Sequence, residues 1–230
     1  MPTLYHSPMS TASRFVRLIL SEYGFQCDLV EEQPWEKRRE FLALNPAGTL
    51  PVYVDDNMRA LCGPNVLAEF LDETHGVLKR DRRLLAEDPF QRAEIRRLTE
   101  WFLQKMENDV TRPLVRERVY KLQMTAAQGG GAPDSKLLRT ARANIRQHMR
   151  YLEWLSGSRT WLAGDRLSYA DLAAAAGVSV LDYLGEIDWL ESPITKEWYQ
   201  RLKSRPSFRP MLGERIRGLA PSSHYADLDF

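Results

Sequence analysis

Apolar and polar positions change their spacing several times over the first third of the chain. Short apolar-rich stretches typical of strands alternate with longer stretches whose apolar residues recur at helical spacing. The predicted strands are residues 3–7, 27–32, 49–54 and 60–62, and the predicted helices are residues 10–23, 36–44 and the segment after Gly63. The order β-α-β-α-β-β-α predicts an α/β unit with a mixed sheet over residues 1–78.

Strand signals end after a charged linker at residues 79–88, and the rest of the chain has helical periodicity. We expect a long helix that bends at Pro113, then a loop rich in glycine. The predicted helices are residues 89–124, 135–156, 168–182 and 196–202. The pattern thus predicts an all-helical domain over residues 89–217, followed by a tail at residues 218–230.

Composition narrows the class of protein. The chain is 43% hydrophobic and 27% charged, as in an ordinary globular protein, and its net charge of +1 argues against attraction to nucleic acid or membranes. No apolar run approaches the ~20 residues that span a bilayer, and no secretory signal is visible. Cys27 and Cys62 fit neither a metal-ligand nor a CxxC pattern. We therefore expect a cytoplasmic protein without a metal site or membrane insertion.

Three local motifs carry further information. Residues 45–53 read NPAGTLPVY, residues 164–175 read GDRLSYADLAAA, and residues 198–212 read WYQRLKSRPSFRPML. In the second motif, Ser168 and Asp171 have the spacing of a helix capping box. In this order, on an α/β unit followed by a helical half, the motifs resemble the glutathione S-transferase superfamily. The resemblance implies a thioredoxin-like N-terminal domain plus an all-α C-terminal domain (the GST fold).

The resemblance also implies where glutathione would bind. Pro51 matches the family's cis-proline, and the backbone of Leu50 before it would pair with the cysteinyl unit. At the start of the helix after the hairpin, family members carry Glu or Gln and then Ser, whose hydroxyl and N–H bind the γ-glutamyl carboxylate. Here Gly63 and Pro64 stand at those positions, and proline has no N–H. Each lost hydrogen bond to a charged group costs about 1.5–3 kcal/mol. We therefore expect absent or weak glutathione binding, no cofactor, and no enzymatic activity.

The catalytic position of the family has several nearby hydroxyls, at Tyr5, Ser7, Ser10 and Thr11. Ser10 directly precedes a helix, where it would either stabilise a thiolate or simply cap the helix. A divergent transferase acting on small electrophiles is the alternative function. It would hold the carboxylate with Arg14 or Asn65 and bind its substrate near Trp35, Trp101 and Met106, aromatic and apolar residues that fit a domain core equally well.

Basic residues gather in the first two long helices of the second half. Residues 91–150 hold thirteen Lys and Arg against six Asp and Glu. One cluster contains Arg112, Arg116, Arg118 and Lys121, and a stripe at helical spacing contains Arg139, Arg142, Arg146 and Arg150. These residues form either a solvated face with ion pairs or a docking surface for an acidic protein filament.

The tail is the second feature that suggests a protein partner. Its candidate contact residues are His224, Tyr225, Asp227, Leu228 and Phe230. Aromatic residues are enriched at interfaces. The tail either docks a partner or folds back over the vacated cleft, and both hold if the packed tail forms part of the docking surface. If the chain is a non-catalytic partner-binding protein, removing residues 225–230, or reversing Arg116 and Arg118, should abolish partner binding and leave the melting temperature nearly unchanged.

The Gly63-Pro64 junction, the basic helices and the tail together resemble a particular branch of the superfamily, the transferase-like bacterial division proteins that bind FtsZ. That resemblance implies a homodimer that binds FtsZ filaments and regulates their organisation and curvature at the division site. The family dimerises through the first two long helices of its helical domain.

Overall fold

The computed structural model describes all 230 residues. The N-terminal unit is a four-stranded sheet in the order β2-β1-β3-β4, with β1 parallel to β2 and antiparallel to β3. Its elements are β1 (Thr3–His6), α1 (Thr11–Tyr23), β2 (Asp28–Glu31), η1 (Pro34–Glu36), α2 (Arg39–Leu44), β3 (Val52–Val54), β4 (Ala60–Cys62) and α3 (Pro64–Thr74). This confirms the predicted α/β unit with a mixed sheet.

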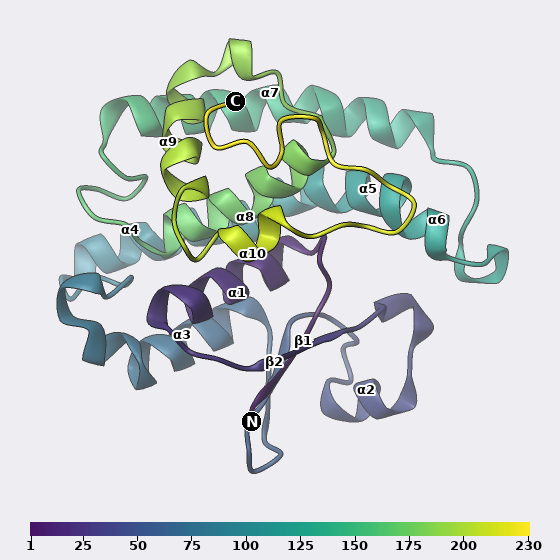
Figure 1. Cartoon of the computed structure of the whole chain (residues 1–230), viewed down its shortest axis with the longest axis horizontal. Coiled ribbons are helices and arrows are strands. Elements are labelled where there is room, and N and C mark those ends of the chain that lie inside the picture. The colour runs from purple at the N-terminus through teal and green to yellow at the C-terminus, as the bar shows by residue number, and fades with distance from the viewer.

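Because side chains alternate along a strand, the two faces of the sheet pack against different helices. Leu4 and Tyr53 pack into the main core with α1 and α3. Val52 and Val54 point the other way and pack against Phe41 of α2. The sheet therefore lies between α2 on one side and α1 with α3 on the other, and α1 and α3 separate it from the helical domain (Figure 1).

The C-terminal unit is helical throughout, as predicted. A 3-10 segment, η2 (Gly76–Arg82), joins the two units. The other elements are α4 (Pro89–Glu100), η3 (Trp101–Thr111), α5 (Arg112–Val115), η4 (Arg116–Tyr120), α6 (Lys121–Gln123), η5 (Ala126–Gln128), α7 (Ser135–Ser158), α8 (Tyr169–Tyr183), η6 (Trp189–Glu191), α9 (Pro193–Lys203) and α10 (Arg209–Leu212). None of the helices combines the length and the apolar character needed to cross a bilayer.

The long helix predicted around Pro113 changes its winding along its length. The segments η3 and η4 are π-helical, and the α-helical turn α5 lies between them. Pro113 follows η3 without a break in the helical dihedral angles, so its missing N–H removes one donor from the interior of a continuous helix. The chain thus absorbs the proline through changes of helical pitch, a form of distortion that the sequence pattern did not specify.

A single large core joins the two units. Every residue of α8 is buried, and α8 packs against α1, α4 and η3. The predicted capping box is confirmed: the Ser168 N–H donates to Asp171 Oδ2 at 3.0 Å, and the Ser168 hydroxyl caps the first turn of α8. Asp171 also accepts from Leu162 N–H (2.9 Å) and Trp198 Nε1 (3.0 Å), so it fixes three segments of the helical domain at once.

Candidate functional site

The loop before β3 keeps the geometry that the family resemblance implies. The Leu50-Pro51 peptide bond is cis, as predicted. Asn45 braces the loop, because its side-chain amide donates to the Thr49 carbonyl (2.8 Å) and its oxygen accepts from Ala47 N–H (3.2 Å). The backbone N–H and C=O of Leu50 make no hydrogen bond within the chain. An extended peptide could therefore still pair with Leu50.

The neighbouring strand-to-helix junction offers much less to a carboxylate. Gly63 has a φ of +92°, a conformation that favours glycine, and its N–H donates to the Pro51 carbonyl at 3.0 Å. Pro64 then starts α3 without an N–H, and no side chain caps the helix. Of the first turn, only the N–H groups of Asn65 and Val66 remain to face an anion. The hydroxyl and N–H that family members use at Pro64 are both missing.

Ser10 is the N-cap of α1. Its hydroxyl accepts from Ser13 N–H at 3.2 Å, which confirms the capping interpretation. Two of the three neighbouring hydroxyls are also engaged, whereas the ring of Tyr5 packs against Phe41 on the α2 side of the sheet. Ser7 Oγ lies 3.2 Å from the Tyr120 hydroxyl, and Thr11 Oγ1 donates to Thr111 Oγ1 at 3.2 Å, so both bonds join the two domains. These groups hold the domains together at the position where a transferase would hold a thiolate.

A cleft of about 960 Å³ lies between the domains next to this position. Its walls include Ser7, Trp35 and Tyr120, and residues 215–218, which lead into the tail, line one side. Trp35 packs on Tyr120 with ring centroids 4.7 Å apart, and burial raises the pKa of Tyr120 to about 12.

Of the residues predicted for a substrate pocket, only Trp35 lines this cleft. Met106 is fully buried in the core, and Trp101 packs on His148 and Tyr151 of α7, so the prediction was wrong for these two residues. Leu50, Pro51, Gly63 and Pro64 lie outside the cleft lining. The cleft therefore borders the family's catalytic position at Ser7 but is not lined by the residues expected to hold the ends of glutathione.

Arg14, a predicted alternative anchor for the carboxylate, is unavailable to any ligand. Its side chain is 0% exposed and donates to Pro8 C=O (2.6 Å), Ser179 Oγ (2.7 Å) and the Tyr225 hydroxyl (3.1 Å). The proposed role of Arg14 is therefore wrong, because its donors are satisfied by the protein itself. Asn65, the other candidate, is exposed at the start of α3.

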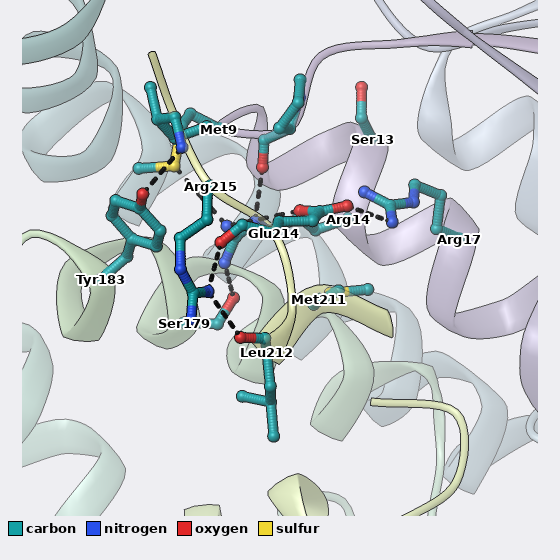
Figure 2. Close-up of polar contacts among 12 residues, drawn as sticks. Met9, Ser13, Arg14, Arg17, Ser179, Tyr183, Met211, Leu212, Glu214 and Arg215 are labelled. Carbon is teal, nitrogen blue, oxygen red and sulfur yellow. Dashed lines mark hydrogen bonds and ion pairs between the residues drawn. The ribbon is translucent and has the colours of Figure 1, made fainter. Parts of the chain in front are cut away.

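Glu214 completes this buried network and was missed from the sequence. Its carboxylate forms an ion pair with Arg17 and lies 3.9 Å from Arg14 Nη2 (Figure 2). The contact ties the segment after α10 to α1 of the N-terminal domain. The sequence held one indication that a buried acidic partner exists. Arg14 and Arg17 lie within the apolar stripe of the first helix, where an unpaired charge is costly.

The tail folds back onto its own helical domain (Figure 1), which confirms one of the two interpretations. Tyr225 is fully buried, and its ring packs edge-on against Tyr183 at 5.0 Å. His224 Nε2 lies 2.9 Å from Asp182 Oδ1, and Phe230 lies beneath Lys203 Nζ at 4.1 Å. Burial raises the pKa of the Asp182 carboxyl, and Lys203 and His224 partly offset that effect.

The packed tail corrects two details of the prediction. It packs on α8 and α9 and makes no hydrogen bond to the Pro64 junction; of its residues, only Gly218 lines the cleft. Tyr225 cannot contact a partner, since no part of it is exposed, and His224 and Phe230 are half-buried. Asp227 and Leu228 remain exposed. Removal of residues 225–230 would therefore disturb the core, so that variant does not separate binding from stability.

The basic cluster is more strongly paired than the sequence suggested. Arg118 Nη1 donates to Glu186 at 2.6 Å and to Leu184 C=O at 2.8 Å, and Lys121 Nζ lies 2.6 Å from Glu117. These two side chains are therefore not free to bind an acidic partner, which corrects their assignment. Arg112 and Arg116 are exposed, with carboxylates only at 3.8 Å and 4.0 Å.

Comparison with known proteins identifies the family. Models of the glutathione S-transferase N-terminal and C-terminal domains match residues 4–81 and 117–213. The chain belongs to the glutathione S-transferase family.

Relatives of this family member align along its whole length. FtsZ-localized protein A of Caulobacter vibrioides is 43% identical over 231 residues, covering 99% of this chain and 98% of the relative. The solved structure of FzlA from C. crescentus is 44% identical with a TM-score of 0.91, covering 100% of this chain and 99% of that one. A glutathione S-transferase structure from Sinorhizobium meliloti 1021 is 80% identical with a TM-score of 0.99 and full coverage of both chains. The similarity therefore includes both domains and the tail.

Proposed function

We propose that this chain is a non-catalytic member of the glutathione S-transferase family that binds FtsZ filaments and regulates their organisation and curvature in the cytoplasm at the division site. The observation that carries the proposal is the 43% identity to FtsZ-localized protein A over 99% of the chain. A fold by itself does not fix function, but similarity that includes the tail and the helical domain extends to the surfaces a partner would meet.

The glutathione remnants support the non-catalytic part of the proposal. Pro64 supplies neither the hydroxyl nor the N–H that would hold a γ-glutamyl carboxylate, and Arg14 is occupied within the core. A thiol whose amino-acid end is not held cannot be positioned for reaction, since orientation is a large part of transferase catalysis. We further propose a homodimer, which would present two filament-binding sites and raise avidity without new contacts.

Co-sedimentation with purified FtsZ assembled with GTP tests this proposal. We expect the chain to pellet with filaments, and the exposed-tail variant Asp227→Ala/Leu228→Ser to pellet less, since both side chains are accessible. The matched control Asp165→Ala/Leu78→Ser changes an exposed Asp and an exposed Leu outside the tail and outside the basic helices, and it should pellet normally. If the wild-type chain stays in the supernatant even at low salt, the proposed function is wrong.

A divergent transferase acting on small electrophiles is the second candidate, and one observation favours it. The backbone of Leu50 is unpaired beside the cis-proline, so one half of a glutathione site is retained. Turnover in a conjugation assay on a panel of electrophiles, lost in Ser10→Ala, would establish this function. Absence of turnover across the panel would leave the binding role.

A further inference from the structure

The exposed stretch at the end of the tail is held on both sides. We call residues 226–229 the tail loop. Before the loop, Tyr225 is fully buried, and after it the ring of Phe230 packs against the helical domain. All four loop residues are exposed, and their backbone makes one hydrogen bond, from Asp227 N–H to the His224 carbonyl at 3.0 Å. The conformation of the loop therefore depends on the residues that hold its two ends.

Phe230 lies in a cage of aromatic and cationic side chains. Its ring centroid is 5.1 Å from that of Trp189, 6.3 Å from that of Tyr199 and 5.2 Å from that of His224. Lys203 Nζ lies 4.1 Å from the ring centroid, which is close enough for a cation–π interaction. We call these four surrounding residues the Phe230 cage. The ring is thus fixed from several sides although it is only half-buried.

One buried carboxylate binds every residue of this cage. Asp182 is fully buried, and its Oδ1 lies 3.2 Å from Trp189 Nε1 and 2.9 Å from His224 Nε2. Its Oδ2 accepts from the Tyr199 hydroxyl at 3.2 Å and lies 3.6 Å from Lys203 Nζ. Burying a carboxylate is costly unless it is well paired, and here each partner also contacts the caged ring. The cage is therefore a preformed site for one aromatic ring.

The tail loop itself adds little to the core, since its four side chains are exposed. An open hollow of about 640 Å³ lies beside it, and the wall of this hollow includes Asp227, Phe230 and Leu190, whose side chain is 92% exposed. The residues that hold the loop belong to α8, η6, α9 and the tail. None of them lies on the two long helices through which the family dimerises. The cage thus holds a loop that remains on the surface.

We propose that Phe230 is a positioning residue, which holds the tail loop in the conformation that the filament protein recognises. This inference rests on the proposed function, in which Asp227 and Leu228 of the loop are accessible docking residues. A loop that is ordered before binding loses less conformational entropy on binding than a mobile one. The caged ring stays against the helical domain, so Phe230 has a different role from the partner contact expected from the sequence.

FtsZ co-sedimentation of substitutions at Phe230 tests this inference. We expect Phe230→Ala to bind about tenfold more weakly than wild type, because the partner must then order the loop. Phe230→Tyr keeps a ring in the cage and should bind within about twofold of wild type. Phe230→Leu keeps apolar volume without the ring, and its affinity should lie between the two. The matched control Phe25→Ala removes another half-buried phenylalanine, one that packs on His75 in the N-terminal domain, and should bind within about twofold of wild type.

Two further measurements separate positioning from direct contact. Relaxation of the backbone amides of the tail loop in NMR should give order parameters above about 0.6 in wild type and Phe230→Tyr, and below that value in Phe230→Ala. A double-mutant cycle combines Phe230→Ala with Asp227→Ala/Leu228→Ser. The loop substitutions should weaken binding less in the Phe230→Ala background than in wild type, because both changes disable the same contact.

Each other outcome has a defined meaning. Wild-type affinity in Phe230→Ala, an ordered loop in that variant, or a mobile loop in the wild type would each overturn this inference and leave the proposed function intact. Additive effects in the cycle would mean that Phe230 contacts the partner independently, against the inference. An equal loss in Phe25→Ala would assign the effect to lowered stability and would also overturn it. Failure of the wild-type chain to pellet overturns the proposed function and this inference with it.

Discussion

At the residue scale, buried charge organises the join between the two domains. Arg14 and Arg17 occupy the buried side of α1, and Glu214 from the segment after α10 lies against both (Figure 2). Burying an arginine is costly unless its donors are satisfied, and Arg14 has acceptors from three other segments. Loss of one partner would leave a buried charge or donor of this network unpaired, which is costly. Because Tyr225 is one of these partners, the network makes the tail part of the folded core.

His6 allows a prediction at the same scale. It is buried on β1, its Nδ1 has no partner, and burial with the nearby charge of Arg17 lowers its pKa from 6.5 to about 4. Below pH 6.5, His6 is therefore protonated in the unfolded chain, whereas in the folded protein it stays neutral until the pH approaches 4. Stability from this group is fully present above pH 6.5 and falls as the pH drops toward 4, by about 3 kcal/mol in total.

Urea unfolding of wild type and His6→Gln at pH 7 and pH 4 checks this prediction. Carboxylates also titrate in this range, but they do so equally in both proteins. The variant should therefore lose about 3 kcal/mol less than wild type between the two pH values. Equal losses in the two proteins would show that His6 is not held neutral by the fold.

At the element scale, local chemistry was predictable and tertiary pairing was not. The Ser168–Asp171 capping box and the Ser10 cap depend on residues a few positions apart, which the sequence displays directly. The cis Leu50-Pro51 bond was expected from the family resemblance, because an X–Pro pair by itself is rarely cis. The pairing of Arg118 with Glu186 joins elements distant in the sequence, and no periodicity indicates it. The same limit explains why Glu214 was missed and why Tyr225 was assigned to a surface.

The packing of the tail gives a prediction for that element. Tyr225→Ala removes a fully buried ring and a partner of Arg14, so we expect a loss of roughly 3–5 kcal/mol in the free energy of unfolding. Asp227→Ala, two residues further along and exposed, should change it by less than about 0.5 kcal/mol. Chemical denaturation followed by circular dichroism measures both. Equal midpoints would mean that the tail is not part of the core in solution.

At the scale of the whole molecule, the chain has both domains of the glutathione S-transferase family, and one strand-to-helix junction lacks a backbone N–H and a capping side chain. The sheet, the α8 core and the cis-proline loop all follow the family, and the similarity to relatives runs from end to end. The strand-to-helix junction at Gly63-Pro64 lacks the groups that the family resemblance implies for the charged end of glutathione. Fold prediction from the sequence succeeded because it rested on many positions; the functional conclusion depends on very few.

A calorimetric titration of the chain with glutathione, beside the same titration of Pro64→Ser, tests the central claim most directly. We expect no saturable heat from the wild-type chain at millimolar glutathione. Pro64→Ser restores an N–H and a hydroxyl at the start of α3 and should bind at least about tenfold more tightly. Micromolar binding by the wild type, with no gain in the serine variant, would contradict the claim that this family member has lost its thiol substrate.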